Sequence, residues 1–192
     1  MANAWFETVA EAQERTGEKP YLVGFSLGGY LGIDWVAGHP DRVCGLLAAS
    51  CGTVPHRLLL GGWRYLARVI HAFPDRGRRL NDTVVRIFVP EPGATDVLVG
   101  GVALEVMEDV LTALPTLRPL HSLRRIDIPI LFVNGALDHI RLHAEAYLRA
   151  STAGRLVTVP RATHMVSVPH PEVFTRLLLE GHAAASGPAS HP

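Results

Sequence analysis

Ser26 stands in the segment Gly24-Phe25-Ser26-Leu27-Gly28-Gly29, between a short apolar run and a helical pattern. A serine at the apex of so tight a turn needs space for the backbone, and glycines two residues before and after it would supply that space. Such a turn raises the hydroxyl above the end of a strand, where it can act as a nucleophile. The Leu27 N–H opens the following helix and could donate one hydrogen bond to an oxyanion. The pattern predicts a serine nucleophile with Leu27 in the oxyanion hole.

A glycine-rich turn whose serine only caps the helix is the alternative interpretation of this segment. Two other readings of the glycines are excluded. They do not fit the G-x-G-x-x-G pattern of dinucleotide-binding folds, and no lysine follows them as a phosphate-binding loop requires.

A serine nucleophile needs a general base, and the base needs an acid to orient it. In parallel α/β sheets the catalytic residues lie in loops at the carboxyl ends of strands. This rule leaves few of the ten histidines as candidates for the general base. His164 follows the apolar run 155–159, and Asp138 follows the run 128–133. The order Ser26, Asp138, His164 differs from the order in two other common serine-hydrolase folds. A histidine bonded only to backbone and an aspartate that closes its own turn are the alternatives.

The elements that would position these residues alternate between helix and strand patterns. Helical periodicity or length predicts helices at 3–16, 27–37, 141–150 and 172–184, and short apolar runs predict buried strands at 21–25, 43–49, 128–133 and 155–159. Strands separated by helices pair in parallel through right-handed crossovers. We therefore expect an α/β fold with a partial parallel sheet of about four strands flanked by helices.

Together these segments resemble the α/β-hydrolase superfamily, particularly its lid-bearing, esterase-like members. The matching pieces are GFSLGG at 24–29, PILFVNGALD at 129–138, RATHM at 161–165 and HPEVF at 170–174. The resemblance implies the roles of nucleophile, acid and general base for Ser26, Asp138 and His164. It also implies hydrolysis of an ester-type carbonyl in a small-molecule substrate through an acyl-enzyme, with no metal and no cofactor. Thioester, amide or carbon–carbon bond hydrolysis and cofactor-free perhydrolysis remain open as alternatives.

The middle of the chain differs from its two ends. We expect a hydrolase core over 1–52 and 126–185, a helical cap or lid inserted over 53–125, and a disordered tail over 186–192. Between 53 and 90 there are seven arginines and only two aspartates, which fits either an anionic substrate or partner or a solvated helical face. The aromatic residues of the insertion fit either an apolar acyl pocket or the core of the insertion itself, which we favour for most of them: Trp63, Tyr65, Phe73 and Phe88.

The segment before Ser26 is short for this superfamily. Its 25 residues predict one helix and one strand, whereas the resemblance implies several strands, one of them followed by a loop that supplies the second oxyanion N–H. Three explanations are open: a fragment or misplaced start, which we favour, a homo-oligomer paired through the open edge at 21–25, or a minimal hydrolase. The non-enzymatic alternative is a truncated, inactive remnant that acts as a binding module.

Composition excludes several other classes of protein. The charges balance at 18 basic and 18 acidic residues, which argues against a nucleic-acid partner. No apolar run reaches the roughly 18–20 residues that span a bilayer, so we expect no membrane partner. The polar segment 1–19 predicts no signal peptide, and with Cys44 and Cys51 as thiols we expect a cytoplasmic protein. His139 and His143 have helical spacing, but no third metal ligand accompanies them.

Overall fold

The fold is that of a computed structural model, which describes residues 2–187. It divides into two compact units. Unit 1 comprises Met1–Val54 and Pro119–Pro192, and unit 2 comprises Pro55–Arg118. The expected insertion at 53–125 is therefore longer than unit 2, because the helix at 119–123 belongs to unit 1.

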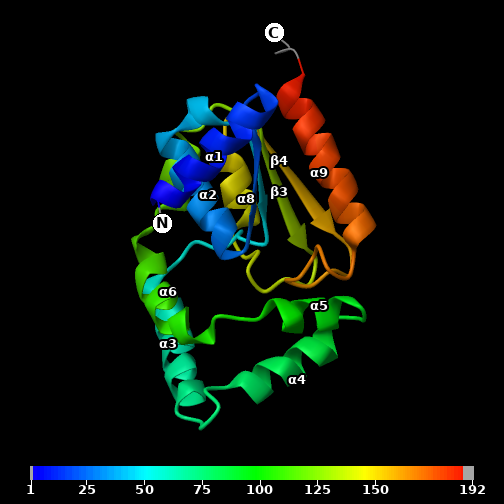
Figure 1. The fold of residues 1–192 in the computed structure, drawn as a ribbon. Coiled ribbons are helices and arrows are strands. Elements are labelled where there is room, and N and C mark those ends of the chain that lie inside the picture. The colour runs from blue at the N-terminus through cyan, green and yellow to red at the C-terminus, as the bar shows by residue number, and fades with distance from the viewer. Residues whose placement is uncertain (1, 188–192) are drawn as a thin grey trace. The chain divides into compact units, whose positions relative to one another are not determined.

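Unit 1 is built on one sheet whose four strands pair in the order β1-β2-β3-β4. All three pairings are parallel, as predicted. The elements, which can be followed in Figure 1, are α1 (Ala2–Thr16), β1 (Tyr21–Phe25), α2 (Leu27–Gly38), η1 (Pro40–Arg42), β2 (Gly45–Ala49), α7 (Pro119–Leu123), β3 (Ile130–Gly135), α8 (Ala144–Ala150), β4 (Gly154–Val159) and α9 (Pro171–Ser186). Among these, α9 lies on one side of the sheet, and α1, α2 and α8 lie on the other (Figure 1).

The two central strands are buried along their whole length, because helices cover both faces of the sheet. Their sequences are accordingly continuous apolar runs rather than alternating patterns. Under α9 the core is formed by one cluster: Leu47, Ala49, Leu131, Val133, Val159, Ala162, Val166 and Leu177. The register pairs Phe25 with Ala49 and Ala49 with Val133, so the carboxyl ends of β1, β2 and β3 lie at one edge.

The bounds of three strands differ from the prediction, those of β4 only by its start at Gly154 rather than Arg155. β2 begins at Gly45 rather than Val43, so Cys44 lies outside the strand and is half-buried rather than part of the core. β3 covers Ile130–Gly135 rather than 128–133. Pro129 explains the later start, since proline has no N–H for the ladder and contributes only its carbonyl, which accepts from Leu46 N–H at 3.0 Å.

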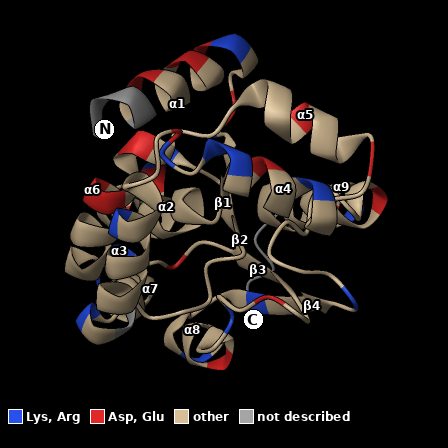
Figure 2. Ribbon diagram, turned by 90° about the horizontal axis from the view of Figure 1, so that it is seen from below, with Lys and Arg blue, Asp and Glu red and all other residues tan. Residues whose placement is uncertain are grey.

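Unit 2 consists of helices with irregular connections. They are α3 (Arg57–His71), α4 (Arg78–Phe88), α5 (Gly93–Gly100), η2 (Leu104–Val106), α6 (Met107–Ala113) and η3 (Leu114–Thr116). α3 packs on α6, where Arg68 forms an ion pair with Glu108, and α4 packs on α5. Figure 2 shows basic residues on α4 and acidic residues on α6.

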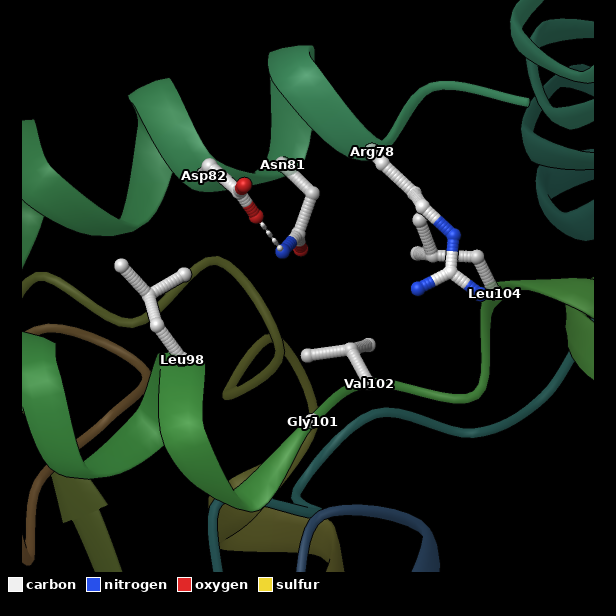
Figure 3. A pocket seen from close by; sticks show the side chains of 7 residues that line it. All are labelled: Arg78, Asn81, Asp82, Leu98, Gly101, Val102 and Leu104. Atoms are coloured by element: carbon white, nitrogen blue, oxygen red, sulfur yellow. Dashed lines mark hydrogen bonds between the residues drawn. The ribbon is translucent and has the colours of Figure 1, made fainter. Parts of the chain in front are cut away.

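A small pocket of about 130 Å³ lies within unit 2, between α4 and the segment that starts on α5. Figure 3 shows its lining, which is Arg78, Asn81, Asp82, Leu98, Gly101, Val102 and Leu104. The polar side of α4, with Arg78, Asn81 and Asp82, lines the pocket. The apolar side, with Leu80, Val84 and Ile87, is exposed.

The aromatic side chains of unit 2 are not its core, contrary to the prediction. Phe73 is 57% exposed and Tyr65 is 73% exposed, and Trp63 and Phe88 are also exposed. Unit 2 instead buries smaller side chains, such as Ala67, Ala94 and Leu104.

The C-terminal helix continues through Ser186, two residues beyond the predicted end. The tail expected over 186–192 thus begins inside this helix, and residues 188–192 lie outside the described part of the chain. Among residues 2–187, no helix has both the length and the apolar character needed to cross a bilayer.

Candidate active site

Ser26 sits at the sharp turn between β1 and α2. Its backbone has φ 52° and ψ −117°, an uncommon conformation for any residue other than glycine. The Ser26 N–H donates to the Ala49 carbonyl at 2.8 Å, which ties the turn to the end of β2. A strained residue held in this way is typical of functional sites.

Of the two glycines predicted to make space at this turn, the structure supports one. A Cβ on Gly24 would lie 2.5 Å from the Gly28 carbonyl oxygen, so position 24 needs glycine, as expected. A Cβ on Gly28 would have no neighbour within 4 Å, so Gly28 is not needed for space. The second essential glycine is Gly29, where a Cβ would lie 2.6 Å from the Cys51 sulfur.

The three predicted side chains lie together at the carboxyl edge of the sheet. Ser26 Oγ is 3.0 Å from His164 Nε2. On the other side of the ring, His164 Nδ1 is 3.1 Å from Asp138 Oδ1 and 3.3 Å from Oδ2. With the ring proton on Nδ1, the imidazole donates to Asp138 and its Nε2 accepts from the Ser26 hydroxyl.

Asp138 is buried, yet it is stabilised as a carboxylate. Burial by itself would raise the pKa of the Asp138 carboxyl, but hydrogen bonds from His164 and from the Ile140 N–H lower it below its usual value. The Ile140 N–H lies 2.8 Å from Oδ1. A dry, ionised carboxylate can orient an imidazole and stabilise its protonated form.

Leu27 is the first residue of α2, so its N–H has no acceptor within the helix. The N–H groups of Gly29 and Tyr30, later in the same turn, donate to the Ser26 carbonyl at 3.0 and 3.3 Å. The positive end of the α2 dipole therefore lies beside Ser26. An oxyanion role for Leu27 stays a prediction.

Three residues that contact the predicted site were not among the predicted catalytic residues. The ring centroid of Phe25 lies 5.3 Å from that of His164, and the ring centroid of the exposed His139 lies 5.6 Å from that of His164. The Ser50 hydroxyl donates to the His164 carbonyl. Position 50 directly follows a strand, and that was the one sequence signal available for it.

The other candidate groups lie in different surroundings. His143 Nδ1 accepts from the Val54 N–H, and residues 2–187 contain no cluster of three or more His, Cys, Asp or Glu side chains that could hold a metal ion. The Cys51 thiol is buried, and burial followed by the nearby Asp138 charge raises its pKa to about 12. A thiol held neutral is a packing group rather than a nucleophile.

Comparisons with known proteins identify the family of the chain. A model of the alpha/beta hydrolase family matches residues 2–177. Curated relatives are pimeloyl-[acyl-carrier protein] methyl ester esterases of Neisseria meningitidis: the serogroup C protein is 27% identical over 175 residues, and a serogroup B protein is 26% identical. Each alignment covers 81% of this chain and 66% of the relative, so the chain spans just under two thirds of their length.

Solved structures show the same fold at low sequence identity. A putative non-heme bromoperoxidase from Mycobacterium tuberculosis superposes with a TM-score of 0.72 at 16% identity, over 97% of this chain and 74% of that one. E-2-(acetamidomethylene)succinate hydrolase gives 0.73 at 18% identity, over 94% and 73%. The parallel sheet, the strand–serine–helix turn and the family match lead to one conclusion: the chain belongs to the alpha/beta hydrolase family.

Proposed function

We propose that the chain carries a serine hydrolase site for carboxylic esters, with Ser26 as nucleophile, His164 as general base and Asp138 as the orienting acid. The observation that carries the proposal is the continuous hydrogen-bonded series from Ser26 Oγ through the imidazole to a buried carboxylate. A nucleophile, a base and an orienting group within hydrogen-bond reach are the requirement for this chemistry.

The proposed reaction has two halves. Ser26 Oγ attacks the ester carbonyl carbon while His164 Nε2 takes the hydroxyl proton, and the carbonyl oxygen becomes an oxyanion beside the Leu27 N–H. The carbon–oxygen bond to the alcohol then breaks, and His164 returns the proton to the departing alkoxide. Water attacks the resulting acyl-enzyme with His164 again as base, and the carboxylic acid leaves with Ser26 restored. Asp138 stays ionised throughout.

For the substrate we propose a methyl ester on an acyl group carried by an acyl carrier protein, the substrate class of the esterases to which the chain is similar. We further propose unit 2 as the cap that selects it. The support is the arginine-rich first part of this unit, since seven arginines and two aspartates fall between 53 and 90, together with the exposed apolar side chains on α4. Comparing carrier-bound with free methyl esters, and both with thioesters, amides and peracid formation, tests this choice.

The catalytic proposal is tested by labelling with a fluorophosphonate followed by peptide mass spectrometry. The folded chain should be labelled at Ser26, and Ser26→Ala and His164→Ala should abolish the label. Asp138→Asn should slow labelling by about 10³–10⁴-fold, because the imidazole loses its oriented tautomer. Ser122→Ala, which removes another buried serine of unit 1, is the matched control. A folded chain that takes no label would favour a binding module instead.

A further inference from the structure

Ser50 occupies a strained position at the centre of the carboxyl edge of the sheet. It directly follows β2, is fully buried and has φ 52°. Its N–H donates to the Val133 carbonyl of β3 at 2.8 Å, just as the Ser26 N–H donates to the Ala49 carbonyl of β2. The backbone at 49–50 thus joins the nucleophile turn to the strand that precedes Asp138.

The Ser50 side chain connects the same point to the proposed base. Its Oγ donates to the His164 carbonyl oxygen at 2.8 Å, and that oxygen also accepts from the Val166 N–H at 2.9 Å. Burial raises the pKa of the Asp138 carboxyl, and hydrogen bonds lower it again. The Ser50 side chain contributes to this lowering, after the larger contributions of His164 and Ile140. The one proton of this hydroxyl thus goes to the backbone of the residue proposed as base.

We propose that Ser50 is a positioning residue that holds the His164 backbone in alignment with Ser26. This inference rests on the proposed hydrolase function. The Ser26–His164 contact joins residues 138 positions apart, and the ring can meet Ser26 Oγ only if the loop that carries it is fixed. Small displacements of a base cost large factors in rate, and hydrogen bonds behind the reacting groups prevent them.

The competing explanation is that Ser50 serves only the turn. Position 50 requires a left-handed backbone conformation, with positive φ, and glycine adopts this conformation more readily than serine. Ser50→Gly therefore separates the two roles, because it keeps the turn and removes the hydroxyl. Ser50→Ala removes the hydroxyl and retains a Cβ, so agreement between the two variants assigns the effect to the lost oxygen.

The experiment measures fluorophosphonate labelling rates and ester kinetics for the wild type, Ser50→Gly, Ser50→Ala and the control Ser122→Ala. Thermal unfolding confirms that each variant is folded. Both Ser50 variants should lower the labelling rate and kcat by about 10–100-fold, with KM changed little, since binding does not depend on the hydroxyl. A second readout needs no turnover: the downfield NMR signal of the His164 Nδ1 proton should shift or broaden in both variants and stay unchanged in Ser122→Ala.

Folded Ser50 variants with wild-type labelling rates and an unchanged Nδ1 signal would overturn the proposal. So would a loss in Ser50→Ala that Ser50→Gly restores, which would show that only the turn matters. Failure of the hydrolase function gives a different result, because the wild type itself then takes no label. In that case the Nδ1 signal alone decides whether Ser50 positions the histidine.

Discussion

The Asp138 carboxylate makes the stability of unit 1 sensitive to acid. Its pKa in the folded chain lies below the ordinary value of 3.8, so its hydrogen bonds stabilise the fold fully above that pH. The stabilisation is lost as the pH falls through the lower, folded pKa. We expect the free energy of unfolding to drop more steeply below about pH 4 in the wild type than in Asp138→Asn. Urea denaturation across pH 2–6 measures the difference, and parallel curves would contradict it.

The glycines around Ser26 allow a matched pair of substitutions. Gly24→Ala places a methyl 2.5 Å from a backbone oxygen and should destabilise the chain by about 1–3 kcal/mol. Gly28→Ala enters open space in the first turn of α2 and should be neutral or stabilising by up to about 1 kcal/mol. Chemical denaturation of both variants checks the order, and equal losses would show that the space at Gly28 is not as described.

The three side chains brought together here could be chosen from sequence because each follows an apolar run that became a strand. Ser50 also follows such a run, but its position alone did not single it out. A serine is not conspicuous among small residues, and its partner, the backbone oxygen of His164, leaves no trace in side-chain types. The glycine pattern likewise showed that space was needed near Ser26, but only packing against Cys51 shows that Gly29 uses it.

The segment after β2 is held by two helices through one carbonyl. The Tyr30 hydroxyl of α2 and the Tyr147 hydroxyl of α8 both donate to the Thr53 carbonyl, at 2.7 and 3.0 Å. Burial raises the pKa of both phenols, so they remain neutral donors. The Thr53 N–H in turn donates to the Tyr30 oxygen at 3.3 Å. Tyr30 therefore serves two backbone groups and Tyr147 serves one.

This difference predicts unequal costs for removing the hydroxyls. Tyr147→Phe leaves the carbonyl one donor and should cost about 0.5–1.5 kcal/mol. Tyr30→Phe also strands a buried N–H and should cost about 1–3 kcal/mol, and the double variant should lose more than the sum. Denaturation midpoints in a double-mutant cycle measure these values. A strictly additive double variant would mean that the two phenols do not share an acceptor.

Which elements form was predictable, but some of their limits and surroundings were not. The alternation of apolar runs and helical patterns identified all four strands, since buried parallel strands are apolar throughout. The start of β3 moved because Pro129 cannot donate to the ladder. The exposure of Phe73 and its aromatic neighbours in unit 2 was missed, because apolar periodicity reports that a face is apolar and not what covers it.

In the molecule as a whole, the four-stranded sheet ends at β4 on one side and at the more apolar β1 on the other. Within residues 2–187 β1 pairs only with β2, and Val23 at its centre is 40% exposed. An apolar strand with a free edge is a template for another chain. We expect the 192-residue chain to self-associate with rising concentration, and Val23→Lys to shift it toward the monomer. Sedimentation velocity over a hundredfold concentration range tests this, with Leu179→Lys on α9 as an exposed control.

The connection between β2 and β3 has an evolutionary consequence. These strands are hydrogen-bonded neighbours, yet the whole of unit 2 lies between them in the chain. The entropic cost of closing a connection grows only with the logarithm of its length, so inserts of very different size are tolerated at this point. Recombination could exchange the inserted segment while the alignment of the strand ends is inherited intact. If unit 2 selects the substrate as proposed, substrate range and bond-breaking chemistry would then diversify independently, on separate parts of the same gene.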